Sequence, residues 1–453
     1  MVIIIYQGGI CNMVRQQIWR KYLLIVLLGG ILLENPLYVL AAPLELSIAD
    51  SIALALQNSP SVKMTEDDKA ISNWAIAEAK ANFGPSLKYS HKDTRTGMPQ
   101  YSLSQYLSGT IFADIAFGGI YNSFGNTLSV NVPLYTGGGL EGQLDKAKKN
   151  LQVADLEVEK NKQQLKLDTT TAYFDVLGAL DQLQVNQESL DNLTAHLKSV
   201  QAQYEEGVVN KADVLRSEVE VINAQQDVMV AQNKYNLTMV SLKKVMSLPL
   251  TSEIKLKDDL NYQQYTATVD DCITYALKNR PDVIQGQTKI DIAKSDVKVA
   301  KSNNLPQVSL AGSNNWNDDS FPGLKQDYWM VSLTASINVF DSGLTKAKVK
   351  GAESSVGKAQ DGVEQVRQTA ALEVSQAYLN LKVAEERIKT SKNAVDKAQE
   401  AFKINEICYK EGVGKNLDVI DAQLALVKAE TNYNQALYDY NSNKAKLDKA
   451  MGL

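Results

Sequence analysis

Two carboxylates, Asp418 and Asp421, stand three residues apart at the start of a predicted helix, where they could act on ions. A separation of three residues places both side chains on one face of a helix. Paired carboxylates of this kind attract cations and resist anions when they line a narrow passage. The alternative is that they are two solvated acids, favoured there by the positive end of a helix.

Other kinds of chemistry have little support. His91 and His196 are the only histidines, and Cys11, Cys272 and Cys408 lack metal-binding spacing, so we expect Cys272 and Cys408 to be free thiols. No nucleophile, phosphate loop or metal motif stands out, which predicts a protein that is not an enzyme and holds no cofactor or metal. The net charge of −5 becomes −7 without residues 1–41, which hold three basic residues and one acid, and this argues against nucleic acid as a partner.

Residues 1–41 have the features of a secretory signal peptide. Arg20 and Lys21 precede an apolar run, Tyr22–Leu33, and Val39-Leu40-Ala41 offers small residues for cleavage. The apolar run is too short to span a bilayer comfortably. A retained N-terminal anchor is the alternative.

The rest of the chain is an internal duplication, with repeats at 42–250 and 251–453. A Tyr-x-x-Gly-Val turn near 204–214 recurs near 409–419. In each turn a glycine, Gly207 or Gly412, is expected to end the incoming helix, and Asn210 or Asn416 is the predicted N-cap of the outgoing helix. We therefore expect these turns to be the tips of two long helical hairpins.

Between the helical segments, apolar residues alternate with polar ones in four stretches, at about 86–95, 126–135, 307–316 and 328–339. In the last of these, Trp329, Val331 and Leu333 alternate with Ser332 and Thr334. Strands of about ten residues with one apolar face are typical of transmembrane barrels. A soluble hairpin packed on a core is the alternative. The connection at 96–125 is expected to carry further β structure.

Apolar residues seven apart follow each pair of strands, for example Leu183, Leu190 and Leu197. Such heptads predict antiparallel coiled-coil packing. The segment 140–206 would be one helix about 100 Å long, and the helices 62–82 and 211–248, stacked end to end, would nearly match it. Each repeat is then one continuous helix beside two stacked ones.

Four strands cannot close a barrel, and open strand edges are not tolerated in lipid. Three chains would supply twelve strands, which is within the range of outer-membrane barrels. The sequence thus predicts an α+β membrane protein, internally duplicated. Its homotrimer would form a 12-stranded β-barrel, four strands per chain, continued by a long α-helical coiled-coil barrel.

The duplicated helix–strand–strand–helix–helix pattern with Tyr-x-x-Gly tips resembles the TolC family of outer-membrane efflux proteins over residues 44–453. The resemblance implies a homotrimeric channel in outer-membrane lipid, with its helical barrel projecting into the periplasm. It also implies a passive exit duct of a tripartite efflux or type I secretion system, gated at its periplasmic tip. Its partners would be a periplasmic adaptor (membrane fusion protein) and an inner-membrane pump. The sequence does not specify the cargo, whether drug, metal ion or polypeptide.

Several tip residues match positions with a role in that family. Asp418 and Asp421 match paired aspartates at the periplasmic entrance, where three copies would place six carboxylates in a constriction. The first repeat has Asp213 but Arg216 at the second place, so the acidic pair belongs to one hairpin. Tyr409 and Asp213 match residues that tie the inner hairpin to the outer one in the closed state.

Gly207-Val208 and Gly412-Val413 match the tip grooves where adaptors dock, the alternative being simple helix-ending turns. One departure concerns the closed state, because Gly414 stands where the family has an arginine. We therefore expect different contacts there, with Lys415 as a candidate.

A second function fits the helical hairpins alone. A periplasmic coiled-coil adaptor or scaffold would hold partners together without a pore. Such a protein needs no strands that face lipid, so the strands decide between the two functions.

Overall fold

The structure, a computed structural model, describes residues 44–102 and 116–453, so the predicted signal peptide 1–41 lies outside the described residues. The chain divides into two units. The described part of the smaller unit consists of residues 44–45 and 251–255, where Leu44 N donates to Glu253 O at 3.0 Å. This bond belongs to the two-stranded sheet of β1 (Leu44–Leu46) and β4 (Ile254–Leu256).

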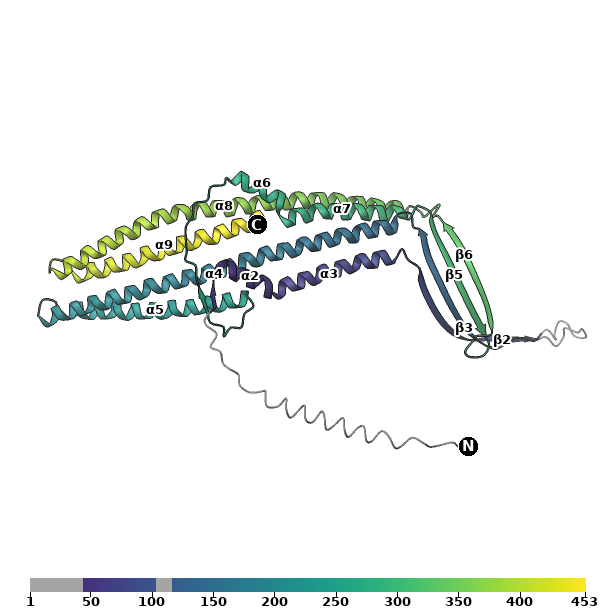
Figure 1. Cartoon of the computed structure of the whole chain (residues 1–453), viewed down its shortest axis with the longest axis horizontal. Coiled ribbons are helices and arrows are strands. Elements are labelled where there is room, and N and C mark those ends of the chain that lie inside the picture. Colours follow the sequence, from purple (N-terminus) through teal and green to yellow (C-terminus); the bar gives the residue numbers. More distant parts are fainter. Residues whose placement is uncertain (1–43, 103–115) are drawn as a thin grey trace, which may run out of the picture. The chain divides into compact units, whose positions relative to one another are not determined.

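The larger unit contains the two repeats, each with the order helix, helix, strand, strand, long helix, returning helix (Figure 1). The first repeat comprises α2 (Ile48–Asn58), α3 (Pro60–Ala81), β2 (Ser86–Ser102), β3 (Ala116–Tyr135), α4 (Gly139–Glu205) and α5 (Lys211–Val245). The second comprises α6 (Val269–Asn279), α7 (Pro281–Ser302), β5 (Gln307–Asp318), β6 (Gln326–Ser336), α8 (Leu344–Lys410) and α9 (Asn416–Met451).

Corresponding helices of the two repeats start with the same capping residues and prolines. The side chains of Ser47 and Asp50 form a capping box at the start of α2, and those of Thr268 and Asp271 form the same box at the start of α6. A proline then opens both α3 and α7, where its missing N–H costs no hydrogen bond. The duplication is therefore one of structure as well as of sequence.

The long helices α4 and α8 have 67 residues each, about 100 Å. Helix α4 packs against α3 and α5 of its own repeat and against α7 and α9 of the other, while α8 packs against α7 and α9. Apolar heptad residues such as Val176, Leu381 and Leu447 are buried along these seams. None of the helices within the described residues combines the length and the hydropathy that crossing a bilayer requires.

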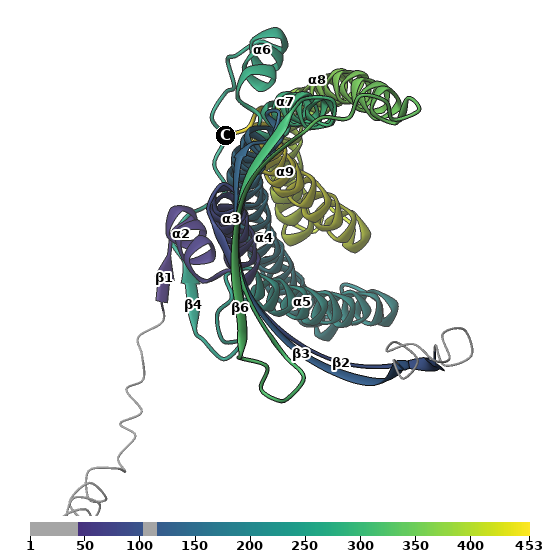
Figure 2. The same ribbon diagram turned by 90° about the vertical axis from the view of Figure 1, so that its right-hand side faces the viewer.

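The four longer strands form one antiparallel sheet in the order β2-β3-β5-β6 (Figure 1). Figure 2 shows the strong curvature of β2 and β3. The register pairs Leu310 with Leu333 and Gly312 with Val331, and thereby gathers apolar side chains on one face. On the opposite face the side chains are mostly polar, and the hydroxyl of Thr127 donates to Asn315 Oδ1 at 2.9 Å across β3 and β5. The fold is thus α+β, with a two-faced sheet joined to long helices.

Two strand boundaries differ from the expected ones. Strand β6 ends at Ser336 rather than near 339, because its partner β5 begins at Gln307 and the preceding Pro306 has no N–H to continue the ladder. Strands β2 and β3 run past 95 and start before 126, so the expected further β structure is found at 96–102 and 116–125. The middle of that connection lies outside the described residues.

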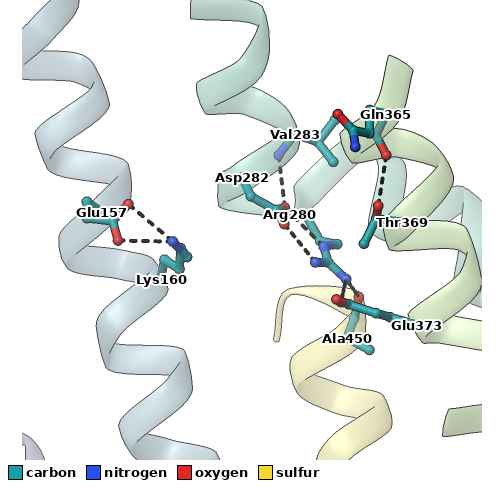
Figure 3. A network of polar contacts seen from close by, with 9 residues as sticks. All are labelled: Glu157, Lys160, Arg280, Asp282, Val283, Gln365, Thr369, Glu373 and Ala450. Atoms are coloured by element: carbon teal, nitrogen blue, oxygen red, sulfur yellow. Dashed lines mark hydrogen bonds and ion pairs between the residues drawn. The ribbon is translucent and has the colours of Figure 1, made fainter. Parts of the chain in front are cut away.

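A buried guanidinium, that of Arg280, joins α7, α8 and α9 where the start of α7 meets the end of α9 (Figure 3). Arg280, only 6% exposed, forms an ion pair with Asp282 at 2.7 Å and a second with Glu373 of α8 at 2.7 Å. Its Nη1 also donates to the carbonyl of Ala450 near the end of α9, at 3.0 Å. Arg280 therefore fixes the start of α7 against α8 and the last turn of α9.

Candidate functional site at the hairpin tips

The two hairpin tips share one backbone conformation. Gly207 and Gly412 have φ angles of +78° and +76°, in the left-handed region that favours glycine. In each tip the N–H of the valine that follows donates to the carbonyl five residues back, at 2.8 Å in the first and 3.0 Å in the second. This is the Schellman arrangement that ends helices. A Cβ on either glycine would meet no atom within 4 Å, so backbone conformation rather than crowding selects glycine.

Each tip presents one valine to solvent. Val208 is 66% exposed and Val413 is 80% exposed, and both stand beside the helix-ending glycine. In the first tip the ammonium of Lys211 also lies 5.6 Å above the ring of Tyr204. Exposed apolar side chains at a tip suit a partner surface. Docking of an adaptor at these residues stays a prediction.

The two predicted N-cap residues behave differently. Asn210 caps α5 as expected, because its Oδ1 accepts a hydrogen bond from the backbone N–H of Asp213 at 3.0 Å. For Asn416 the prediction is wrong. Lys415 is the N-cap of α9 and makes no side-chain cap, while Asn416 is the first residue of the helix and is 5% exposed.

Asn416 instead links the second hairpin to the first. Its Nδ2 donates to the carbonyl of Asp213 at 3.1 Å. Its Oδ1 accepts from Nε2 of His196 at 2.7 Å and from the hydroxyl of Ser217 at 3.2 Å. The hydroxyl of Ser217 also lies 3.0 Å from the Asp213 carbonyl. One amide thus holds both helices of the first hairpin, α4 and α5, against the start of α9.

Tyr409 and Asp213, the expected closed-state pair, lie near each other without a hydrogen bond between their side chains. Tyr409 is 3% exposed and packs with Val200, Val214 and Val419 in a core cluster. Its ring also contacts that of His196 edge-on, with 4.8 Å between centroids. The hydroxyl is buried and has no hydrogen-bond partner among the described residues. Burial, and then the charge of Asp213, raise the pKa of Tyr409.

Asp418 and Asp421 are both exposed and lie one turn apart at the start of α9. The adjacent positions Val419 and Ile420 are buried, so the helix turns its apolar side inward and its acids outward. In the part of the chain that the structure describes, neither carboxylate forms an ion pair. The pair is thus free to act on ions in solution, and its role at a constriction stays a prediction.

The space around position 414 explains why a glycine stands there. A Cβ at this position would lie 2.8 Å from Tyr409 N and 3.0 Å from Cys408 C, so the turn has no room for the family's arginine. Its own N–H donates to the carbonyl of Cys408 at 2.9 Å. Lys415 forms no ion pair within the described residues, and its part in the closed state stays a prediction. The contact between the hairpins that the structure describes runs through Asn416.

Sequence reasoning missed His196 and Ser217, and assigned Asn416 to the wrong task. A signal for His196 existed, since it stands three residues after Leu193 and four before Val200, both buried. A polar residue on that buried face needs a partner.

The two described cysteines are free thiols, as predicted, with Cys272 buried and Cys408 half-buried. Across 44–102 and 116–453 the structure groups no three His, Cys, Asp or Glu side chains that could hold a metal ion.

Comparison with known proteins points to one family. The family described as Outer membrane efflux protein matches residues 51–247 and 272–453. The outer membrane protein TolC of Escherichia coli K12 is 23% identical over 313 residues, which cover 66% of this chain and 64% of that protein. The chain therefore spans slightly less than two thirds of the length of that relative.

Two further proteins are similar over more of their length. The alkaline protease secretion protein AprF of Pseudomonas aeruginosa is 23% identical over 413 residues, covering 89% of this chain and 83% of AprF. The crystal structure of the outer membrane protein VceC from Vibrio cholerae superposes with a TM-score of 0.74 at 17% identity. That match covers 89% of this chain and 96% of VceC, and at this identity it establishes the fold alone.

Proposed function

The chain belongs to the outer membrane efflux protein family, and on that premise we propose that it is the outer-membrane channel of a tripartite efflux or type I secretion system. It conducts passively and catalyses no reaction. Its sheet lies in the outer membrane, its helices project into the periplasm, and its tips close the periplasmic entrance. An inner-membrane pump supplies the energy.

The observation that carries the proposal is the two-faced sheet. On its apolar face Trp329, Val331 and Leu333 are 77%, 64% and 66% exposed. A water-soluble protein would cover such a face, whereas hydrocarbon covers it in a membrane. The polar face would then line an aqueous lumen. A periplasmic scaffold without a pore needs no such face, which favours the channel over that alternative.

The sheet edges support a homotrimer. Strands β2 and β6 each have one neighbour in the described sheet, so each leaves one edge open. In lipid every backbone polar group must be paired, and pairing β6 of one copy with β2 of the next supplies the missing bonds. Three copies give twelve strands, a size found among outer-membrane barrels.

The helices offer matching surfaces for the same assembly. Val219, Ile222 and Val230 on α5 are between 52% and 63% exposed, and Leu379 and Val383 on α8 are 63% and 61% exposed. Rows of exposed apolar side chains on helices of this length suit subunit contacts in a helical barrel. The exposed Val208 and Val413 at the tips are the surface we assign to a periplasmic adaptor.

The experiment that tests the proposal separates outer from inner membranes of expressing cells and runs unheated and heated samples on gels. We expect the protein in the outer-membrane fraction, as a trimer that dissociates to a monomer on heating. Recovery in the periplasm without detergent would support the scaffold and contradict the channel.

A further inference from the structure

His196 lies at the point where the two hairpins meet. It belongs to α4, it is 8% exposed, and its Nε2 is 2.7 Å from Oδ1 of Asn416 on α9. Its ring also contacts that of Tyr409 at the end of α8, with centroids 4.8 Å apart. The imidazole of His196, which belongs to the first hairpin, therefore contacts both helices of the second hairpin.

The hydrogen bonds define which nitrogen of the ring carries the proton. Nδ2 of Asn416 donates to the Asp213 carbonyl, so its Oδ1 must accept. Nε2 of His196 therefore carries a hydrogen, and in the neutral ring Nδ1 does not. A second proton would enter at Nδ1 and place a positive charge in a site with little access to water.

The surroundings of the ring give little compensation for that charge. Burial lowers the pKa of His196; the hydrogen bond that the ring donates to Asn416 and the charge of Glu406 act in the opposite direction, and the charge of Lys410 adds to the lowering. Glu406 and Lys410 also pair with each other at 2.6 Å. The ring contacts Tyr409 of α8 and the neutral amide of Asn416 of α9, and the charges of Glu406 and Lys410 of α8 act on it. Behind these partners, Ser217 of α5 donates to the Asn416 oxygen and the charge of Asp213 of α5 acts on Tyr409; on α4 itself Lys198 is exposed.

We propose that His196 is a pH-sensitive latch, which holds the two tips together while its ring is neutral and releases them when mildly acidic pH protonates it. This inference rests on the proposed function, because it assumes a channel that the tips close. It adds the condition under which they open. In an acidified periplasm the entrance would therefore loosen without any change in the partner proteins.

The direction of the effect follows from proton binding. A separated tip exposes the ring to water and restores the proton affinity of an ordinary histidine side chain, for which the reference pKa is about 6.5. The closed tip binds that proton less well, so its contact is complete above this pH and weakens below it. The ratio of open to closed tips rises by at most about tenfold per pH unit for each subunit.

The test measures open probability of the full-length channel in planar bilayers at pH 7.5 and pH 5.5. We expect wild type to open several-fold more often at the lower pH. His196→Gln keeps a donor for Asn416 but takes up no proton, so its open probability should be equal at both values. His91→Gln removes the other histidine, on β2, and should respond as wild type does. His196→Phe should also be independent of pH, though more often open.

Each outcome decides the matter. Loss of the response in both His196 variants, with the response kept in His91→Gln, supports the latch. The latch is overturned if His196→Gln or His196→Phe still opens more often at pH 5.5, as wild type is expected to do. It is also overturned if the wild-type channel opens equally at both pH values. In these last cases a conducting pore leaves the proposed function standing. No pore in wild type or in Asn416→Ala at either pH would contradict the proposed function as well.

Discussion

The side-chain amide of Asn416 donates to the backbone carbonyl of Asp213 at 3.1 Å, across 203 residues of sequence, and so joins the tips of the two hairpins. The same amide accepts from His196 and Ser217. These bonds are directional, and the two that Oδ1 accepts are buried, so separation of the tips would break them together. We therefore expect Asn416 to help hold the tip closed.

Replacement of Asn416 by Ala should loosen the closed tip. It leaves the His196 ring and the Asp213 carbonyl without their partner, and each unpaired buried group costs about 1–3 kcal/mol. The expected result is a channel that leaks in cells, measured as uptake of a large hydrophilic antibiotic that the outer membrane normally excludes.

The matched control is Asn210→Ala. Asn210 is the N-cap of α5 in the first tip, where Lys415 is the N-cap of α9 in the second, and its side chain caps only its own helix. Its loss should therefore cost about 1 kcal/mol locally and leave the closed entrance intact. Equal antibiotic uptake in both variants would show that Asn416 acts as a local helix residue rather than as a link.

Tyr409→Phe should leave the tips closed. The hydroxyl of Tyr409 is buried without a partner in the described residues, so its removal costs no hydrogen bond and relieves an unpaired polar group. Tyr409→Ala, in contrast, empties a core position and should destabilise the tip by about 3–5 kcal/mol. Both effects can be read from antibiotic uptake and from heat stability of the trimer. Leakage in Tyr409→Phe would mean that the hydroxyl bonds Asp213 after all.

Replacing Asp418 and Asp421 together by Ala should reduce cation preference. The two carboxylates are exposed and have no ion-pair partner in the described chain, so their charge is available to passing ions. We expect the reversal potential in a salt gradient to shift toward zero and block by trivalent cations to weaken several-fold. Asp396→Asn, on exposed α8 surface away from the tips, is the control. Selectivity that stays at the wild-type value in the double variant would refute the role at the entrance.

Arg280→Met should lower stability without opening the tips. Removing the buried guanidinium leaves the partly exposed carboxylates of Asp282 and Glu373 without their partner and frees the last turn of α9, a loss of about 1–3 kcal/mol. The measurement is thermal unfolding in detergent followed by circular dichroism. Lys350→Met removes one member of an exposed pair with Glu353 and should not shift the transition. An unchanged transition in Arg280→Met would contradict this account of the junction.

Much of the architecture could be predicted because local patterns determine it. Strict alternation around Trp329 marked a strand, and the helix-ending Gly207 and Gly412 marked both tips, since each feature depends on neighbours in sequence. The end of β6 at Ser336 was harder to place, because it depends on where the paired strand begins.

The contact between the two tips could not be predicted, for a physical reason. An asparagine at a helix start satisfies the N-cap pattern whether its side chain bonds its own backbone or another hairpin. Only the fold brings Asp213 and His196 to Asn416, and it also shows that Gly414 has no room for a side chain. Resemblance to a family points to Tyr409 and Asp213, and their closed-state role stays a prediction; the structure adds Asn416, which donates to the Asp213 carbonyl.

The most direct measurement is the single-channel conductance of the purified protein in planar bilayers, with wild type and Asn416→Ala compared at neutral pH. A gated duct closed by the Asn416 contact predicts a stable pore in both, with conductance or open probability several-fold higher in the variant. Absence of any pore, or identical conductance and open probability in the two proteins, would contradict it.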